Sequence, residues 1–204
     1  IASITGNSDI TSTAGDLSVR ADDGKRIIRS ISGNVGGAGT AAVGGANVTN
    51  TISGVREALV HGGFLDIAGS VSLASGGTAT IDSIAASAAG AGTAAVTGSL
   101  ALSTIDGAED VILKDASVTA GSVSLINTGD MAIRTASGNA SFAGTAAVGG
   151  ASSVNVMLNR RQALVTGSDL TLSGDLDVLT ANNGSIQTLA TSGGAAGTAA
   201  VGGA

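Results

Sequence analysis

The sequence predicts an all-β fold, a parallel β-helix (β-solenoid) that winds through the whole chain. Three observations predict it: a motif that recurs at a fixed spacing, strict alternation of apolar and polar residues, and glycine-rich segments suited to turns. The composition agrees, because 33 of the 204 residues are Gly and no Pro interrupts the hydrogen bonding between strands. With 43% hydrophobic and 12% charged residues, the chain is expected to fold rather than stay disordered.

The repeat is carried by the hexapeptide Ala-Gly-Thr-Ala-Ala-Val, whose copies begin at Ala38, Ala91, Ala143 and Ala196. These starts are 53, 52 and 53 residues apart. A fixed period longer than any single element is typical of a solenoid, whose units bury apolar faces against one another. We therefore predict one continuous solenoid over residues 1–204. It divides into a partial repeat 1–37, repeats 38–90, 91–142 and 143–195, and the start of another at 196–204.

Each repeat is expected to contain the same elements in the same order. A strand of small residues follows the hexapeptide, and a charged turn comes next, at 55–57, 108–110 and 160–162. Short apolar strands follow at 58–60, 111–113 and 163–165, and then at 65–67, 118–120 and 170–172. Strict alternation then predicts half-buried strands at 71–73, 123–125 and 176–178, matched by 17–19 in the partial repeat. Glycine-containing corners are predicted at 76–77, 129–130 and 183–184, followed by strands at 81–84, 131–133 and 186–189.

Counting these corners, we divide each repeat into two coils of about 26 residues, with three coils of about 18 as the alternative. Two coils per repeat give about 10 Å of axial rise, and a rod of roughly 35 to 40 Å. A propeller is less favoured, because its blades of about 40 to 45 residues usually carry aromatic packing signatures. Trp and Tyr are both absent from this chain.

The stretch Ala41 to Ala46 departs from the alternation, because both faces of its strand carry only small residues. Two interpretations fit this pattern. Either the two walls of the solenoid pack closely there, or another chain or a loop covers the outer side. We favour close packing of the walls, since it explains the small residues without a partner.

Candidate chemistry in the sequence is sparse, and we predict no catalytic, cofactor-binding or metal-binding residues. His61 is the only histidine and lies in a predicted turn, whereas metal sites and catalytic triads need several convergent groups. Carboxylates cluster at Asp22-Asp23, Glu109-Asp110 and Asp175/Asp177. Paired acids on one face could hydrolyse glycosides, but these clusters fall at different places in the repeat, so we expect solvated turns instead.

The composition also argues against several partners. A net charge of -6 and few basic residues disfavour nucleic acid, and no stretch resembles a membrane-spanning helix. The calcium-binding glycine-aspartate nonapeptide is absent, so no cofactor is expected. Thr40, Thr93, Thr145 and Thr198 recur, but one Thr per repeat is expected to be too sparse to match an ice lattice.

The repeats resemble those of bacterial filamentous adhesins of the haemagglutinin and leukotoxin type. The resemblance covers essentially the whole chain and is clearest from Gly144 to Asn159, followed by Arg-Arg-Gln-Ala-Leu-Val. It implies a right-handed parallel β-helix exported by a type V route and displayed on the bacterial cell surface. It implies a structural stalk or filament shaft, not an enzyme, that reaches host or neighbouring cells through other regions of the protein.

The pattern continues to both ends of the sequence, from Ile1 to Ala204. We therefore expect an interior piece of a longer chain. Its partners are expected to be further repeats of the same chain, or other copies in an end-to-end or lateral filament. The alternative is a carbohydrate-active or carbohydrate-binding β-helix, which usually needs aromatic sugar platforms, and only Phe64 and Phe142 are aromatic.

Overall fold

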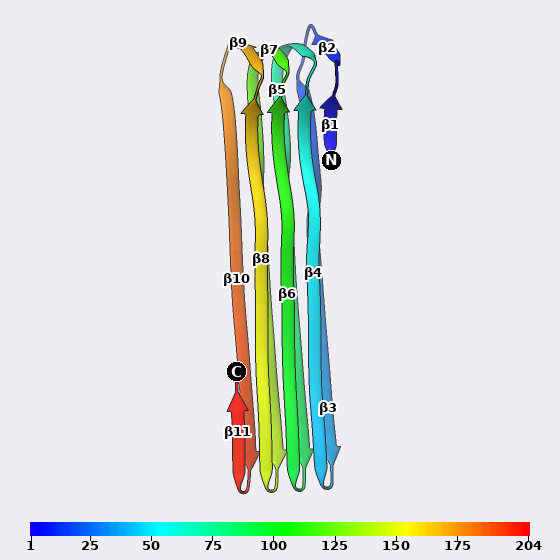
Figure 1. Ribbon diagram of the computed structural model, residues 1–204, viewed down its shortest axis with the longest axis vertical. Coiled ribbons are helices and arrows are strands. Elements are labelled where there is room, and N and C mark those ends of the chain that lie inside the picture. Colours follow the sequence, from blue (N-terminus) through cyan, green and yellow to red (C-terminus); the bar gives the residue numbers. More distant parts are fainter.

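The chain forms parallel β-strands joined by short turns, with no helix, in a computed structural model that describes residues 1–204 except the side chain of Asp23. The strands are β1 (Ala2–Thr5), β2 (Asp9–Ser12), β3 (Leu17–Ala38), β4 (Ala41–His61), β5 (Phe64–Ala91), β6 (Ala94–Lys114), β7 (Ser117–Ala143), β8 (Ala146–Thr166), β9 (Asp169–Leu172), β10 (Leu176–Ala196) and β11 (Ala199–Gly203). The long strands run side by side along the longest dimension of the molecule (Figure 1). The predicted all-β fold of stacked parallel strands is confirmed.

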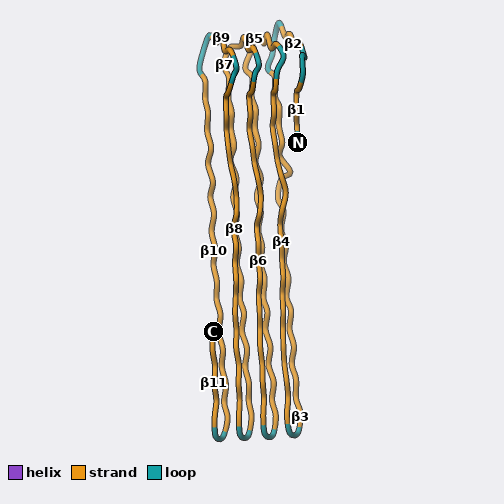
Figure 2. The backbone as a smooth tube through the Cα atoms, in the orientation of Figure 1, coloured by secondary structure: helices purple, strands orange, loops and turns teal.

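Two parallel sheets make the two walls of the solenoid. One has the strand order β1-β4-β6-β8-β11, and the other has the order β10-β7-β5-β2, with β3 also paired to β5 and β9 to β7. Successive strands such as β4 and β5 belong to different sheets and pack face to face. The backbone therefore runs down one wall, turns, and returns along the other (Figure 2).

The strand register corrects the predicted number of coils. Ala41 pairs with Ala94, which pairs with Ala146, so each residue neighbours its equivalent in the next repeat. One coil therefore takes one whole repeat, and the expectation of two coils of about 26 residues is wrong. The glycine corners predicted at 76–77, 129–130 and 183–184 are also wrong, because these residues lie inside β5, β7 and β10. At about 4.8 Å per coil, four coils rise only roughly 20 Å.

The real turns lie at the two ends of the long strands. At one end, Gly39-Thr40 joins β3 to β4, and Thr93 N–H donates to the Thr40 carbonyl in the adjacent coil. At the other end, Gly62 and Gly63 join β4 to β5 with φ angles of 76° and 84°, which favour glycine. The threonines are therefore stacked once per coil, closer together than the sequence argument assumed, although they form a single file.

The largest apolar cluster of the molecule lies near the Gly62-Gly63 turn. There the pairing of β5 with β7 shifts register between Ile67 and Ser70, and residues of β3, β4, β5, β6 and β7 form one apolar core. Its largest fully buried side chains include Leu65, Leu73 and Val123, as the alternating pattern predicts. This part contains the main hydrophobic core of the fold. From it the long strands extend toward the Gly39-Thr40 end as two facing walls, which we call the shaft.

Along the shaft, apolar and polar layers alternate between the walls. One layer is apolar and contains Ile81, Ile105 and Ile133. The next layer toward the Gly39-Thr40 end of the strands is polar. In that polar layer, hydroxyls and amides bond across from one wall to the other, as in Ser83 to Ser103 at 2.9 Å. The equivalent pairs in neighbouring coils are Ser30 with Asn50 at 2.8 Å and Asn155 with Thr135 at 2.7 Å. These cross-wall bonds satisfy polar groups that burial would otherwise leave unpaired.

Near the Gly-Thr turns the two walls approach each other closely, which accounts for the inward-facing small residues of the small-residue stretch but not for the outward-facing ones. Ala42, Ala89 and Ala95 form a buried cluster there. A Cβ added to Gly44 would lie 2.9 Å from the Ala88 carbonyl oxygen of the opposite wall. A side chain at position 44 would therefore require the opposite wall to shift, although the equivalent position of the next coil holds the buried Thr97, which bonds to Asn139.

Candidate functional site

A buried stack of three charged side chains is the most distinctive chemical feature of the interior. Arg56, Glu109 and Arg161 occupy equivalent positions of β4, β6 and β8, so the strand register places them directly above one another. Only 7%, 3% and 2% of their side chains, respectively, is exposed. Alternation along each strand turns them inward, between the two walls.

The central carboxylate binds both guanidinium groups. Arg56 Nη1 forms an ion pair with Glu109 Oε1, and Arg161 Nη1 lies 2.9 Å from Glu109 Oε2. From the opposite wall, Asn127 donates from Nδ2 to the backbone carbonyls of Glu109, at 2.6 Å, and Gln162, at 3.1 Å. The stack is thus linked both along the coil axis and across the solenoid.

The stack carries two positive charges and one negative charge in a poorly solvated position. Burial lowers the pKa of the Arg161 guanidinium, and the Glu109 carboxylate opposes that shift. Arg56 acts in the same direction as burial, because it is a second cation. Asp130 opposes the shift as well, so the carboxylates of Glu109 and Asp130 together favour the charged form of Arg161.

This arrangement corrects the predicted charged turns. Residues 55–57, 108–110 and 160–162 lie within β4, β6 and β8, and the chain does not turn there. Glu109 is not solvated, and its neighbour Asp110 is also largely buried, with Oδ2 2.6 Å from Arg160 Nη2. The prediction of surface turns rested on the rule that a single charged side chain is rarely buried. In this structure the charged side chains are buried as ion pairs with one another.

A second alternating stack lies on the outer face of the other sheet. Arg29, Asp82 and Arg134 are in register on β3, β5 and β7. Asp82 lies 3.4 Å from a guanidinium nitrogen on each side, through separate carboxylate oxygens. The same order of charges thus occurs once inside and once outside the solenoid.

The other residues weighed as candidates do not converge. His61 ends β4 at the turn, half-exposed, with Nε2 3.4 Å from Asp115 Oδ2. Asp22 accepts from Gly24 N–H at 2.8 Å, which lowers its pKa, while the side chain of Asp23 lies outside the described part. Asp175 precedes β10 and Asp177 lies on its exposed face. Within the described residues, no three His, Cys, Asp or Glu gather closely enough to hold a metal ion.

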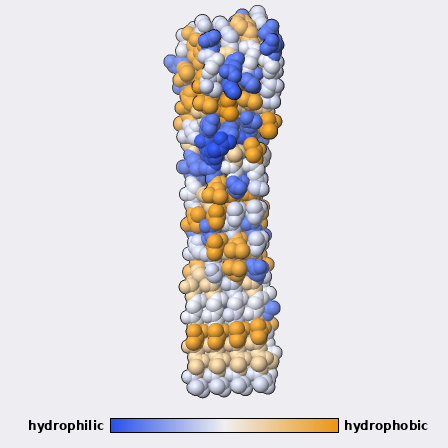
Figure 3. All heavy atoms as spheres, viewed as in Figure 1, coloured by the Kyte–Doolittle hydropathy of each residue, from blue (hydrophilic) through white to orange (hydrophobic). Residues whose placement is uncertain are grey.

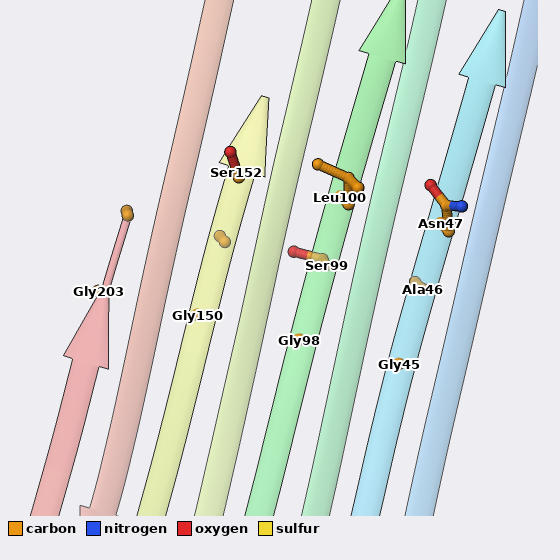
Figure 4. Close-up of a pocket in the computed structure, with 11 residues that line it drawn as sticks. Gly45, Ala46, Asn47, Gly98, Ser99, Leu100, Gly150, Ser152 and Gly203 are labelled. Carbon is orange, nitrogen blue, oxygen red and sulfur yellow. The ribbon is translucent and has the colours of Figure 1, made fainter. Parts of the chain in front are cut away.

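The outer face of the β4-β6-β8-β11 sheet carries an open hollow of about 680 Å³ (Figure 4). Its floor is a file of glycines in register, Gly45, Gly98, Gly150 and Gly203. Asn47, Leu100 and Ser152 border it on one side. No titratable side chain lines the hollow, so its lining provides a surface of distinct shape but no acidic or basic group.

Comparison with protein-family models, with curated proteins and with solved structures finds no match to this chain. The described residues contain no helix with the length and apolar character that crossing a membrane requires. The fold itself defines the class: an all-β protein of stacked parallel strands, consistent with a β-solenoid. A slip of two residues along a strand would separate the opposite charges of its stacks, so we expect the stacks to favour the observed register.

Proposed function

We propose that this chain is a shaft segment of a large secreted bacterial surface adhesin, with a structural role and no catalysis of its own. The coil is right-handed, the chain leaves the cell by a type V route, and adhesion to host or neighbouring cells resides in other regions. This proposal follows the resemblance of its repeats to those of filamentous haemagglutinins and leukotoxin-type adhesins.

The observation that carries the proposal is the register of the coils. The Gly-Thr turn, the inner polar layer and the buried charges recur at equivalent positions in successive coils, as in the ladder from Thr40 through Thr93 to Thr145. Such an arrangement extends by adding identical coils, each of which pairs with the last. A shaft needs this property, whereas a catalytic groove needs a set of residues that occurs once.

The partner supported by this geometry is more of the same structure. In one sheet β10 lies at one edge and β3 at the other, and each presents unpaired backbone N–H and carbonyl groups along that edge; the other sheet ends at β1 and β11. Further repeats of the same chain, or another copy stacked end to end, would pair with these edges. Nucleic acid is not proposed as a partner, since the net charge is -6.

Surface display is tested with antibodies raised against this chain, applied to intact cells that produce the parent protein. Immunogold labelling outside the outer membrane, removed by added protease, is expected. Labelling confined to permeabilised cells would overturn the proposal.

Catalysis is tested by incubating the chain with a panel of polysaccharides and measuring new reducing or unsaturated ends. The shaft proposal expects none. Release of sugar ends that scales with protein concentration would favour the alternative, a carbohydrate-active β-helix. Binding without cleavage would favour a carbohydrate-binding β-helix.

A further inference from the structure

The glycine file on the outer face has no explanation within the chain. A Cβ on Gly45 or Gly98 would lie 4.0 Å from the nearest atom, and one on Gly150 or Gly203 would meet nothing within 4 Å. None of the four has a left-handed φ. Glycine weakens a strand because of its conformational entropy, so a residue with a side chain would be more stable here. The fold does not require glycine at these four positions. Their lack of side chains therefore indicates that another molecule occupies the space above them.

The file beside it is an exposed ridge of valines. Val43, Val96, Val148 and Val201 lie two residues before the glycines on the same face, and 44–78% of each is exposed. Figure 3 shows an apolar, orange row across this face near its lower end, with paler rows on either side. The outer face thus offers a ridge and a trough in adjacent, parallel files.

We propose that this ridge and trough form a lateral interface with a second copy of the chain. A two-fold axis parallel to the coil axis, midway between the two files, places each valine ridge in the partner's glycine trough. The same rotation keeps the coils level, so Val96 of one copy lies over Gly98 of the other. The interface is self-complementary in both shape and period, because a second copy presents the same spacing of about 4.8 Å between coils together with the matching ridge and trough.

The size of the contact sets its strength. The Ala41, Val43 and Gly45 files, each across four coils, and the three members of the Asn47 file cover about 500 Å² per copy, or about 1,000 Å² in total. This is near the lower limit for a specific interface. The isolated chain is therefore expected to dimerise weakly, and each further coil would add contact in proportion. This inference deepens the proposed shaft function by pairing two shafts side by side.

The test fills the trough without disturbing the fold. In the variant Gly45→Val/Gly98→Val, the new side chains point into open space and occupy the place of the partner's valines. The matched control is Gly37→Val/Gly90→Val, a similar pair on the outer face of the other sheet, where an added Cβ also meets nothing closer than 4.0 Å. Sedimentation equilibrium over a wide concentration range measures the association of each protein, and thermal unfolding checks that each one folds.

We expect a dimer of the unaltered chain at high concentration, an association at least about tenfold weaker in the trough variant, and no change in the control. Both variants should unfold at or above the midpoint of the unaltered chain. A chain that stays monomeric at all concentrations, or equal association in both variants, would overturn the lateral interface. Neither result bears on surface display, so failure here is distinguishable from failure of the shaft proposal.

Disulfide trapping separates lateral from end-to-end contact. The chain has no cysteine, so Val96→Cys and Gly98→Cys can each be introduced alone. Mixed under mild oxidation, the two variants are expected to form heterodimers in preference to either homodimer, because the two-fold axis pairs position 96 with position 98. Equal amounts of all three species would contradict the proposed axis.

Discussion

Arg161 Nη1 lies 2.9 Å from Glu109 Oε2, with both side chains almost fully enclosed between the walls. Glu109 also binds Arg56, so one carboxylate forms ion pairs with buried cations in the coils on both sides of it. Removing a partner from a buried pair is strongly destabilising, whereas replacing the whole group with apolar residues is often neutral. We therefore expect the charge stack to contribute more to selecting the register than to the total stability.

Glu109→Gln should reduce the free energy of unfolding by about 3–5 kcal/mol, because two buried guanidinium groups would lose the carboxylate with which both form ion pairs. Chemical denaturation of the variant and the unaltered chain measures the difference. The control is Asp82→Asn in the outer stack, where the same order of charges is solvated and the expected loss is about 0–1 kcal/mol. Similar losses in both variants would contradict the distinction between buried and exposed stacks.

The triple variant Arg56→Met/Glu109→Leu/Arg161→Met should be at least as stable as the unaltered chain, within about 1 kcal/mol, since it removes the desolvation of all three charges. If the stack selects the register, the variant should also lose uniqueness. Broader amide and methyl resonances in its NMR spectrum are the expected sign. A triple variant that loses as much stability as Glu109→Gln would mean that the charges stabilise the fold outright.

Gly44→Val should destabilise the chain by about 1–3 kcal/mol, because its side chain would enter the space occupied by the backbone of the opposite wall. Gly45→Val, one residue along and facing outward, should be neutral or slightly stabilising. Thermal unfolding at low protein concentration compares the two. Equal tolerance would show that the walls can separate near the Gly-Thr turns.

Val123→Asp should abolish folding or weaken it by several kcal/mol, because Val123 is fully buried and an aspartate there would have no partner. Ser124→Asp, directed outward, should be nearly silent. Circular dichroism and denaturation curves give the comparison. If the two substitutions were equally damaging, the inner and outer faces assigned to β7 would be wrong.

Acid should weaken the contact between Asp16 and Ser70. The Ser70 backbone N–H and hydroxyl both donate to Asp16 Oδ1, at 2.7 and 2.8 Å, and these bonds lower the pKa of the Asp16 carboxyl. A carboxyl whose pKa is lower in the folded state contributes stability above its unfolded pKa of about 3.9 and loses it as the pH falls further. The stability difference between the unaltered chain and Asp16→Asn should therefore be constant near neutral pH and vanish in strong acid. Ser70→Ala should reduce that difference, and an unchanged pH profile would refute the assignment.

Sequence periodicity predicted the strands because inward residues such as Leu73 and Leu125 recur in every repeat and alternate with polar ones. It misplaced the turns because glycine has two uses. Gly76 lies inside β5, where an added Cβ would collide with the Thr128 backbone of the neighbouring coil, so its lack of a side chain serves close approach and not a corner. Composition alone does not distinguish these two roles.

The charged stack was missed for a different reason, although its signal is present in the sequence. Equivalent positions of three repeats read Arg56, Glu109 and Arg161, so the sign of the charge alternates from one repeat to the next. A solvated turn has no need for such alternation, whereas stacked neighbours do. Arg29, Asp82 and Arg134 show the same alternation, but sequence alone does not say which stack is buried.

One coil per repeat also determines how such a solenoid would respond to force. Strands of 21 residues extend about 70 Å, whereas the two walls are only about 10 Å apart, so a stack of coils has the cross-section of a tape. Resistance to bending rises steeply with the thickness of the cross-section in the direction of the bend. A fibre of these coils would flex readily perpendicular to its sheets and stay rigid within their plane, and pairing two tapes face to face would stiffen the weak direction.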